Sequence, residues 1–341
     1  MQIQSNFSLK PYNTFGIDVQ ARYFSAFSDI EQLKELATNI PIPIGTSKTT
    51  FILGGGSNIL FTKNFDGFVW KNDIRGIAKV NEDNEYVYVK VGAGENWHQF
   101  VLFSIGNKWQ GIENLSLIPG NVGASPMQNI GAYGVEIKEV FVELTAFHLH
   151  ERSIRKFSVD DCEFGYRESV FKRKYKDQFV ILDVTYRLNK IPRYNTSYGA
   201  LEKELDRMKV QNISIAAISK AIINIRTSKL PDPAVIGNAG SFFKNPLVSK
   251  EKFKDLAAEF QNIVGYENSD GTIKLAAGWL IEQCGWKGFR RGDAGCYEKQ
   301  ALVLVNYGRA TGKEIYDLSE EIFQSVRNKF GVDLEREVNI I

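Results

Sequence analysis

Cysteine and histidine are both scarce in this sequence, with three residues of each among 341. The odd number of cysteines and the lack of a CxxC pair argue against a disulfide scaffold. Cys162, Cys284 and Cys296 are therefore expected to be neutral thiols in a reducing cytoplasm. His148 and His150 share one face of an expected strand, but no third ligand lies near them in sequence, so we predict no metal site.

Long apolar runs and an excess of one charge are also missing. No stretch approaches the ~20 apolar residues that a membrane-spanning helix needs. Residues 1–16 lack the basic segment and the apolar run of a secretory signal. The 42 basic and 40 acidic residues give a net charge of +2, so neither nucleic acid nor a membrane is expected as a partner.

The length and the residue patterns indicate at least two domains. A single hydrophobic core usually stops growing at about 250–300 residues. The patterns indicate a first module up to about Lys190 and a second, α/β-patterned module after it. Periodicity predicts helices at 29–37, 97–105, 213–226, 251–260, 276–284 and 312–330, and strands at 51–53, 86–91, 141–147, 180–188, 301–306 and 334–341.

Two glycine-rich stretches are candidates for ligand binding. Residues 54–58 (GGGSN) follow an expected strand, and glycines leave backbone N–H groups open to a phosphate. Their spacing is neither that of a P-loop nor GxGxxG, so a tight surface turn is the alternative. Residues 106–134 contain six glycines, which suggests a backbone lying against a large flat ligand, with Gln128 and Asn129 bonded to ring heteroatoms. The alternative is a glycine-rich loop without a ligand.

Three further segments carry side chains whose roles the pattern leaves open. Arg167 follows a short helix with an expected capping box, and it is either a solvated arginine or a guanidinium paired with an anion. In residues 237–246 (GNAGSFFKNP), the hydroxyl of Ser241 stands between a glycine and two phenylalanines. On the expected last strand, Glu335 and Glu337 share one face, which is usually the solvent side.

Taken together, these motifs resemble the UDP-N-acetylenolpyruvoylglucosamine reductase family, flavoenzymes of peptidoglycan synthesis that are also called UDP-N-acetylmuramate dehydrogenases. The resemblance implies an α+β chain with an FAD-binding fold of the vanillyl-alcohol-oxidase (PCMH) type in two lobes, and a smaller α/β substrate-binding domain. It runs nearly end to end, through residues 13–16, 53–58, 92–95, 118–134, 166–169, 237–246, 300–305 and 334–338.

The resemblance also implies domain boundaries. Residues 1–75 are expected to form the first FAD-binding lobe, and residues 76–210 the second lobe with a mobile tyrosine loop. Residues 211–330 are expected to bind the substrate, and residues 331–341 to return a catalytic glutamate to the active site.

FAD is the cofactor that the resemblance implies, with a pyrophosphate site at 54–58 and a wall beside the flavin at 118–134. The FAD is expected to be noncovalent, because no histidine or cysteine occupies the glycine-loop positions that tether it in related oxidases. The implied FAD contacts are Gly54, Gly55, Gly56, Ser57, Asn58, Ile118, Pro119, Gly120, Gly123, Ser125, Gln128 and Asn129.

The family's three catalytic positions match Arg167, Ser241 and Glu337. The implied reaction passes a hydride from NADPH through FAD to the methylene carbon of an enolpyruvyl ether. Arg167 and Glu337 would stabilise the resulting enolate, and Ser241 would supply the proton. A serine hydroxyl is a weak acid, so this role requires an oriented hydroxyl and a strongly basic intermediate.

The implied substrate contacts are Tyr133 near the sugar and Tyr198, Lys229, Asn245 and Gln300 at the UDP group. The loop at 193–200 resembles the family form whose mobile tyrosine closes over the substrate. Asn339 stands where some members carry arginine, which puts an anion contact there in doubt, and the chain ends four residues after Glu337. Lys244 receives no role.

Two other functions remain open at this point. An FAD-linked oxidase of the same fold would keep the glycine loops but would not need Ser241 together with Lys229 and Tyr198. A nucleotide-sugar binding protein without redox activity would be colourless. The expected partners are NADPH and UDP-N-acetylglucosamine enolpyruvate, and the enzyme is expected to be cytoplasmic and monomeric.

Overall fold

Two short segments near the N-terminus group with the C-terminal third of the chain. The computed structural model describes residues 2–39, 50–268 and 270–341. Unit 1 comprises Met1–Phe7, Ala21–Gly55 and Asp66–Ser228, and unit 2 comprises Ser8–Gln20, Gly56–Phe65 and Lys229–Ile341. This grouping differs from the simple break after Lys190, because backbone pairing joins segments that are distant in sequence. The ligand-based division into lobes and a substrate domain stays a prediction.

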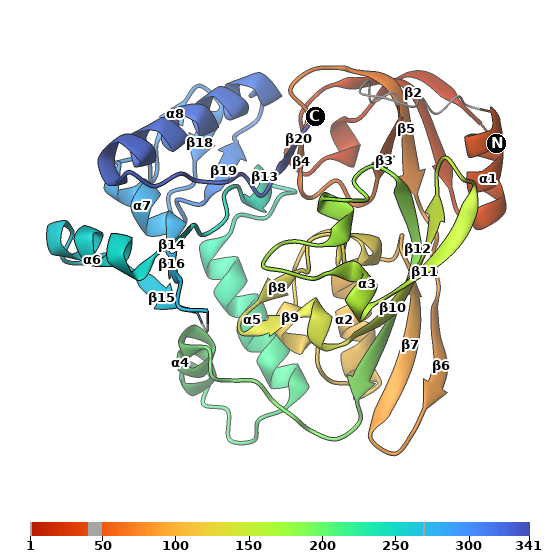
Figure 1. Ribbon diagram of the computed structural model, residues 1–341, viewed down its shortest axis with the longest axis horizontal. Helices are drawn as coiled ribbons and strands as arrows, with labels where there is room; N and C mark the ends of the chain where they lie inside the picture. Colours follow the sequence, from red (N-terminus) through yellow and green to blue (C-terminus); the bar gives the residue numbers. More distant parts are fainter. Residues whose placement is uncertain (1, 40–49, 269) are drawn as a thin grey trace. The chain divides into compact units, whose positions relative to one another are not determined.

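A five-stranded sheet organises unit 1 (Figure 1), in the order β11-β10-β12-β7-β6 with antiparallel neighbours. Its central strand is buried along almost its whole length, as expected of a long apolar run with neighbours on both sides. The bounds are β6 (Ile77–Glu82), β7 (Tyr86–Gly92), β10 (Phe141–His148), β11 (Ser153–Ser158) and β12 (Phe179–Asn189).

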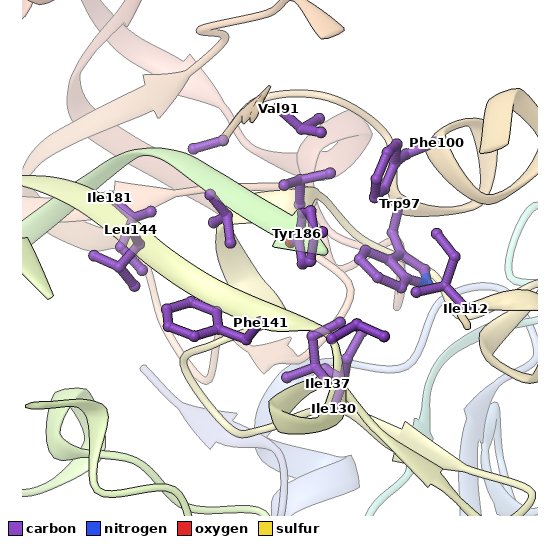
Figure 2. Packing of buried hydrophobic residues seen from close by; sticks show 14 of the residues in the cluster. Val91, Trp97, Phe100, Ile112, Ile130, Ile137, Phe141, Leu144, Ile181 and Tyr186 are labelled. Carbon is purple, nitrogen blue, oxygen red and sulfur yellow. The ribbon is translucent and has the colours of Figure 1, made fainter. Parts of the chain in front are cut away.

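Aromatic packing on this sheet forms the main core of unit 1 (Figure 2). Tyr186 of β12 packs against both Trp97 and Phe100 of α2 (Trp97–Gly106), with ring centroids 5.9 Å and 5.1 Å away. All three side chains are buried. Edge-to-face and tilted aromatic pairs add about 0.5–1.5 kcal/mol to the free energy of area burial. The helix that follows residues 92–95 is therefore held firmly against the sheet.

The rest of unit 1 consists of a second sheet, a short hairpin and several helices. The second sheet has the order β1-β2-β5-β3, and β3 and β5 are parallel. These elements are β1 (Gln4–Ser8), β2 (Gln20–Phe27), α1 (Ile30–Asn39), β3 (Thr50–Leu53), β5 (Phe65–Asn72), β8 (Gly131–Ala132), β9 (Val135–Glu136), α3 (Val159–Cys162), α4 (Gly199–Arg207) and α5 (Ile215–Lys229), with η2 (Glu113–Leu115), η3 (Val122–Ala124), η4 (Ile137–Glu139) and η5 (Val170–Lys172) as single 3₁₀ turns.

Unit 2 contains a four-stranded sheet of order β13-β19-β18-β17, a three-stranded sheet of order β14-β16-β15, and the parallel pair β20-β4. The elements are η1 (Lys10–Tyr12), β4 (Ile59–Leu60), β13 (Gly237–Ser241), β14 (Leu247–Val248), α6 (Lys250–Glu259), β15 (Gly265–Glu267), β16 (Ile273–Leu275), α7 (Ala277–Gln283), β17 (Arg290–Arg291), β18 (Ala294–Cys296), β19 (Val303–Asn306), α8 (Gly312–Phe330) and β20 (Asn339–Ile340).

Helix α8 shows how sequence signals set the bounds of an element. Thr311 and Glu314 form a capping box at its start, and Gly331 ends it with a φ of 59°. The buried residues Ile315, Leu318, Ile322, Val326 and Phe330 recur every three or four positions. Figure 1 shows the helix beside β18 and β19 of the same unit.

Most of the predicted helices and strands are confirmed, and α8 has the predicted bounds. The predicted strand at 334–341 is wrong in extent. Only Asn339–Ile340 pairs as a strand, with β4, whereas Arg336 makes an isolated bridge to Phe243. The change of partner needs a bend at Val338, which side-chain alternation does not reveal. Strand β2 and helix α4 have no counterpart in the sequence-based prediction.

Gly312 provides a test of how tightly α8 packs in unit 2. A Cβ at this position would lie 1.7 Å from the carbonyl oxygen of Phe61. We expect Gly312→Ala to lower the free energy of unfolding by about 3 kcal/mol, at the upper end of typical overpacking costs. Chemical denaturation measures this effect. Gly106→Ala is the control, because a Cβ there has no atom within 4 Å. Equal stability of the two variants would contradict the prediction.

Candidate functional site

The structure brings Gly55 of the first glycine-rich stretch into contact with the second stretch, and both belong to unit 1. A Cβ on Gly55 would lie 2.8 Å from the Cα of Gly120 and 2.9 Å from Oδ1 of Asn121. Gly123 is equally close to Ala93, where the built Cβ would come within 2.6 Å of the alanine Cβ. These glycines are therefore required by backbone packing within the protein, a reason that the sequence did not reveal.

Gly54 and Gly56 complete the first glycine loop in different ways. A Cβ on Gly54 would have no atom within 4 Å, so this part of the loop is open. Gly56 has a φ of 64° and lies against the carbonyl of Tyr12, and its own carbonyl accepts a hydrogen bond from the Thr14 amide at 3.0 Å. The role of residues 54–58 at the FAD pyrophosphate stays a prediction.

Two of the predicted FAD contacts have side chains engaged within the protein. The Ser125 hydroxyl is buried and lies 2.7 Å from that of Tyr186. The Asn129 amide donates to Glu136 and to the Gly165 carbonyl, both at 3.0 Å, and its oxygen accepts from the Lys138 amide at 3.1 Å. Both side chains therefore shape the loop, whereas direct contacts to FAD from them stay predictions.

Arg167 occupies a strained position in a tight turn of unit 1. Gly165 and Glu168 close the turn by exchanging backbone hydrogen bonds, and Arg167 has a φ of 53°. A positive φ is uncommon outside glycine and often marks functional sites. Its guanidinium donates to the Gly131 carbonyl and lies over the ring of Tyr166 at 5.4 Å. The guanidinium is therefore held in place by the protein.

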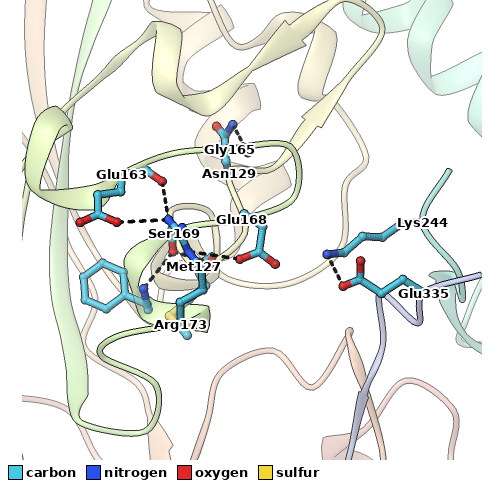
Figure 3. A network of polar contacts seen from close by, with 10 residues as sticks. Met127, Asn129, Glu163, Gly165, Glu168, Ser169, Arg173, Lys244 and Glu335 are labelled. Carbon is cyan, nitrogen blue, oxygen red and sulfur yellow. Dashed lines mark hydrogen bonds and ion pairs between the residues drawn. The ribbon is translucent and has the colours of Figure 1, made fainter. Parts of the chain in front are cut away.

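A polar network holds this turn against the glycine-rich stretch (Figure 3). Ser169 donates to the Met127 carbonyl at 2.7 Å, next to the bond from Asn129 to Gly165 described above. Arg173 adds contacts to the Glu163 carbonyl at 3.1 Å and to the Glu168 carboxylate at 3.7 Å. Sequence reasoning identified Arg167 itself, but not the residues that position it.

Tyr133 and Tyr198, both predicted at the substrate, lie together in unit 1. Their rings meet edge to face, with centroids 5.4 Å apart. Tyr133 and Gly134 form the two-residue turn between β8 and β9, with φ values of 51° and 83°. Such a turn favours asparagine and glycine, so a tyrosine at its first position is unusual. Asn114 donates to the Tyr133 carbonyl and to that of Asn195, both at 2.9 Å, and so ties the tyrosine loop to this turn.

Arg226 and His98 also belong to this part of unit 1, and the sequence prediction missed both. Arg226 donates to the Leu117 carbonyl at 3.2 Å. Burial lowers the pKa of Arg226 and raises that of Tyr133. Nδ1 of His98 accepts from the Leu117 amide at 3.0 Å. Arg226 lies four residues after the buried Ile222, on the same face of α5. This spacing is the sequence signal that could have predicted a buried arginine.

Ser241 of unit 2 follows directly after a β-bulge in strand β13. Asn238 pairs with Val305 and Ser241 with Val303, so β13 has one residue more than β19 between these pairs. Gly240 provides the extra residue with a φ of 71°, as expected for a bulge that begins with glycine. Ser241 is half-buried, and its hydroxyl has no hydrogen-bond partner among the described residues. Phe242 and Phe243, which follow Ser241, are buried.

The segment that carries Glu337 runs antiparallel to the residues after Ser241. The Glu337 amide donates to the Phe242 carbonyl at 2.9 Å, and the Lys244 amide donates to the Glu335 carbonyl at 2.8 Å. The structure therefore brings two predicted catalytic residues onto neighbouring segments of unit 2. The third predicted catalytic residue, Arg167, belongs to unit 1.

Lys244, which received no role from the sequence, reinforces this pairing. Its side chain is 6% exposed, and Nζ lies 2.6 Å from Oε1 of Glu335 (Figure 3). The same two residues are joined through their backbones. The paired backbone and side-chain contacts fix the register of the terminal segment two residues before Glu337.

Asn245 and Gln300 meet at the start of α7 in unit 2. Oδ1 of Asn245 accepts from the Ala277 amide at 3.0 Å, and a Cβ on Gly278 would lie 2.9 Å from Oε1 of Gln300. Lys229 is exposed at the end of α5. The structure therefore brings two of the predicted nucleotide contacts together, whereas it shows no contact between Lys229 and either of them.

The cysteines and the two strand histidines are the remaining residues that the sequence analysis singled out. The three cysteines are free, and burial raises the pKa of Cys162 and Cys296 to about 12, so both are neutral thiols. The rings of His148 and His150 are 6.3 Å apart, and no cluster of metal-ligating side chains occurs among the described residues. None of the described helices combines the length and the apolar character needed to cross a membrane.

Comparison with known proteins decides the family. The chain is 49% identical to the UDP-N-acetylenolpyruvoylglucosamine reductase of Flavobacterium johnsoniae, and 51% identical to that of Amoebophilus asiaticus, over the full length of both chains in each case. It belongs to the UDP-N-acetylenolpyruvoylglucosamine reductase family. The predicted resemblance is thereby confirmed, and the chain is an FAD-dependent oxidoreductase.

Family models and a solved structure agree with this membership. A model described as the C-terminal domain of UDP-N-acetylenolpyruvoylglucosamine reductase matches residues 232–341, and an FAD binding domain matches residues 45–148. The reductase structure from Thermus caldophilus has a TM-score of 0.70 at 22% identity and covers 100% of this chain. The predicted α+β, FAD-binding fold is confirmed. The roles of individual residues stay predictions.

His98 gives this reductase a testable dependence on pH. Burial, and secondarily the charge of Arg226, lowers its pKa from 6.5, so the folded state binds a proton less readily than the unfolded state. The stabilising effect of the neutral ring is present above pH 6.5 and is lost as the pH falls towards the lowered pKa.

We expect the free energy of unfolding to decline below pH 6.5, and this part of the decline to disappear in His98→Gln. Denaturant titrations between pH 5 and pH 8 provide the measurement. His150→Gln, which changes an exposed histidine, serves as the control and should keep the decline. An unchanged pH profile in His98→Gln would refute the assignment.

Proposed function

We propose that this chain reduces UDP-N-acetylglucosamine enolpyruvate to UDP-N-acetylmuramate in peptidoglycan synthesis, with NADPH as the hydride donor. Full-length identity of 45–51% to reductases of that name supports the reaction. The observation that supports the residue roles is the backbone pairing of residues 335–337 with residues 242–244, directly after Ser241. The proposal includes a cytoplasmic, monomeric enzyme.

FAD, when bound, would supply the redox chemistry of the reaction, which moves a hydride from NADPH to the methylene carbon of the substrate. The glycine loop at 54–58 would hold its pyrophosphate through backbone N–H groups. Residues 118–123, with Gln128, would line the flavin, and Ser125 and Asn129 would hold that stretch in shape through their observed hydrogen bonds. Contact between the loops at Gly55 and Gly120 supports this assignment.

The chain's own residues would then manage the charge and the proton. After the hydride arrives, the neighbouring carbon carries negative charge that spreads into its carboxylate. The guanidinium of Arg167, held by the Gly131 carbonyl, would stabilise that charge, and Glu337 would do so as an acid. Ser241, which follows the β-bulge, would donate the proton to this neighbouring carbon.

Substrate recognition would use the remaining predicted residues. Tyr133 would lie near the sugar, and Tyr198 would close over the UDP group with Lys229, Asn245 and Gln300. The edge-to-face contact of Tyr133 with Tyr198 supports a common role for these two rings. The common location of Asn245 and Gln300 at α7 supports a shared role in binding the nucleotide.

Ser241→Ala tests the proposed proton transfer. We expect reduction of the bound flavin by NADPH to keep its rate, whereas reoxidation by the enolpyruvyl substrate slows by about 10²–10⁴-fold, the usual contribution of a positioned acid. Stopped-flow absorbance separates the two half-reactions. Ser249→Ala is the control, because it removes a hydroxyl of the same unit that caps α6.

The same experiment distinguishes the alternatives. Equal reoxidation rates in Ser241→Ala and the unmodified protein would disprove the role of Ser241 as proton donor. Reoxidation by oxygen but not by the enolpyruvyl sugar would favour an FAD-linked oxidase. A colourless purified protein that binds the nucleotide sugar would favour a binding function.

A further inference from the structure

Asn58, at the end of the glycine loop, forms hydrogen bonds with the terminal segment of unit 2. Its side-chain amide donates to the Glu337 carbonyl at 3.1 Å. Its own carbonyl accepts from the Asn339 backbone amide at 3.1 Å and from Nδ2 of Asn339 at 2.9 Å. Three hydrogen bonds therefore join one residue of the loop to two residues of the terminal segment.

These contacts immobilise the backbone of Glu337 on both sides. Its amide is bonded to the Phe242 carbonyl, and its carbonyl accepts from Asn58. The next residue, Val338, is where the segment bends and changes its partner from Phe243 to Ile59. A bend between two short pairings is the point where the segment would otherwise move most, because a single bridge and a two-residue strand hold little by themselves.

Asn339 has a different chemistry from the arginine that some family members carry at this position. Its side chain is short, and it donates back to the same carbonyl that its own backbone amide contacts. In this chain, therefore, the side chain at position 339 contacts the loop backbone. The loop itself is firmly placed, because Gly56 lies against Tyr12 and is bonded to Thr14.

We propose that Asn58 and Asn339 form a clasp that positions Glu337 for the reaction, with Asn339 as a positioning residue. The inference rests on the proposed function of Glu337. It links the glycine loop to the placement of a catalytic carboxyl group, and it assigns a role to the position at which this chain departs from the family pattern.

The first experiment compares Asn339→Ala and Asn339→Asp with Thr62→Val in the full-length FAD-bound protein. The two Asn339 variants lose the Nδ2 donor. Thr62→Val removes a hydrogen bond of 2.9 Å to the Ile341 carbonyl, which joins the same two strands beyond Glu337. We expect reoxidation of the flavin by the enolpyruvyl substrate to slow about 10-fold in both Asn339 variants and to keep its rate in Thr62→Val. Reduction by NADPH should be unaffected in all three.

A double-mutant cycle with Glu337→Gln shows whether Asn339 acts through Glu337. If it does, Asn339→Ala should slow reoxidation about 10-fold in the unmodified protein but by less than about 2-fold in the Glu337→Gln background. A 10-fold effect in both backgrounds, or an equal effect of Thr62→Val, would overturn the clasp. If Glu337→Gln alone leaves reoxidation unchanged, the proposed role of Glu337 fails instead, whatever Asn339 does.

Amide hydrogen exchange provides a readout that does not depend on catalysis. We expect Asn339→Ala to increase the exchange rate of the Glu337 amide, and Thr62→Val to increase only that of the Ile341 amide, which is bonded to the Leu60 carbonyl. Unchanged exchange at Glu337 in Asn339→Ala would also contradict the clasp.

Discussion

The backbone pairing between residues 242–244 and residues 335–337 is the interaction on which the proposed chemistry of unit 2 depends. It consists of two amide–carbonyl hydrogen bonds, which together form the isolated bridge between Phe243 and Arg336, and the buried side chain of Lys244 reinforces it through Glu335. Breaking a pair with one buried partner is costly because that charge loses its compensation. This short pairing holds the segment of Glu337 beside the segment of Ser241, although the two residues are far apart in the sequence.

Local backbone conformations outside the usual regions recur at the proposed functional residues. Arg167, Tyr133 and Asn129 have positive φ values, and Gly240 forms the bulge before Ser241. Each conformation is maintained by surrounding hydrogen bonds, such as those from Asn114 to Tyr133 and from Asn129 to Gly165. Conformational strain of this kind costs about 1–3 kcal/mol per residue and persists only where neighbouring contacts determine the position.

The glycines show how one residue type serves two physical purposes. The sequence led us to expect that they leave room for a ligand, and the open position at Gly54 agrees with this. Gly55 and Gly123 are needed because other parts of the protein, the backbone of Gly120 and the residue Ala93, approach too closely for a Cβ. Sequence alone does not distinguish these purposes, since in both cases the requirement is the lack of a side chain.

The sequence by itself determined the family, the helix and strand pattern and most local signals, because these depend on residue order and on short-range periodicity. The bounds of α8, at residues 312 and 330, are an example. Only the tertiary structure decided that residues 8–20 and 56–65 belong with the C-terminal unit, that Arg226 contacts Leu117, and that Asn58 binds Glu337 and Asn339. Those relations arise from hydrogen bonds between residues up to 291 positions apart, for which periodicity along the chain contains no signal.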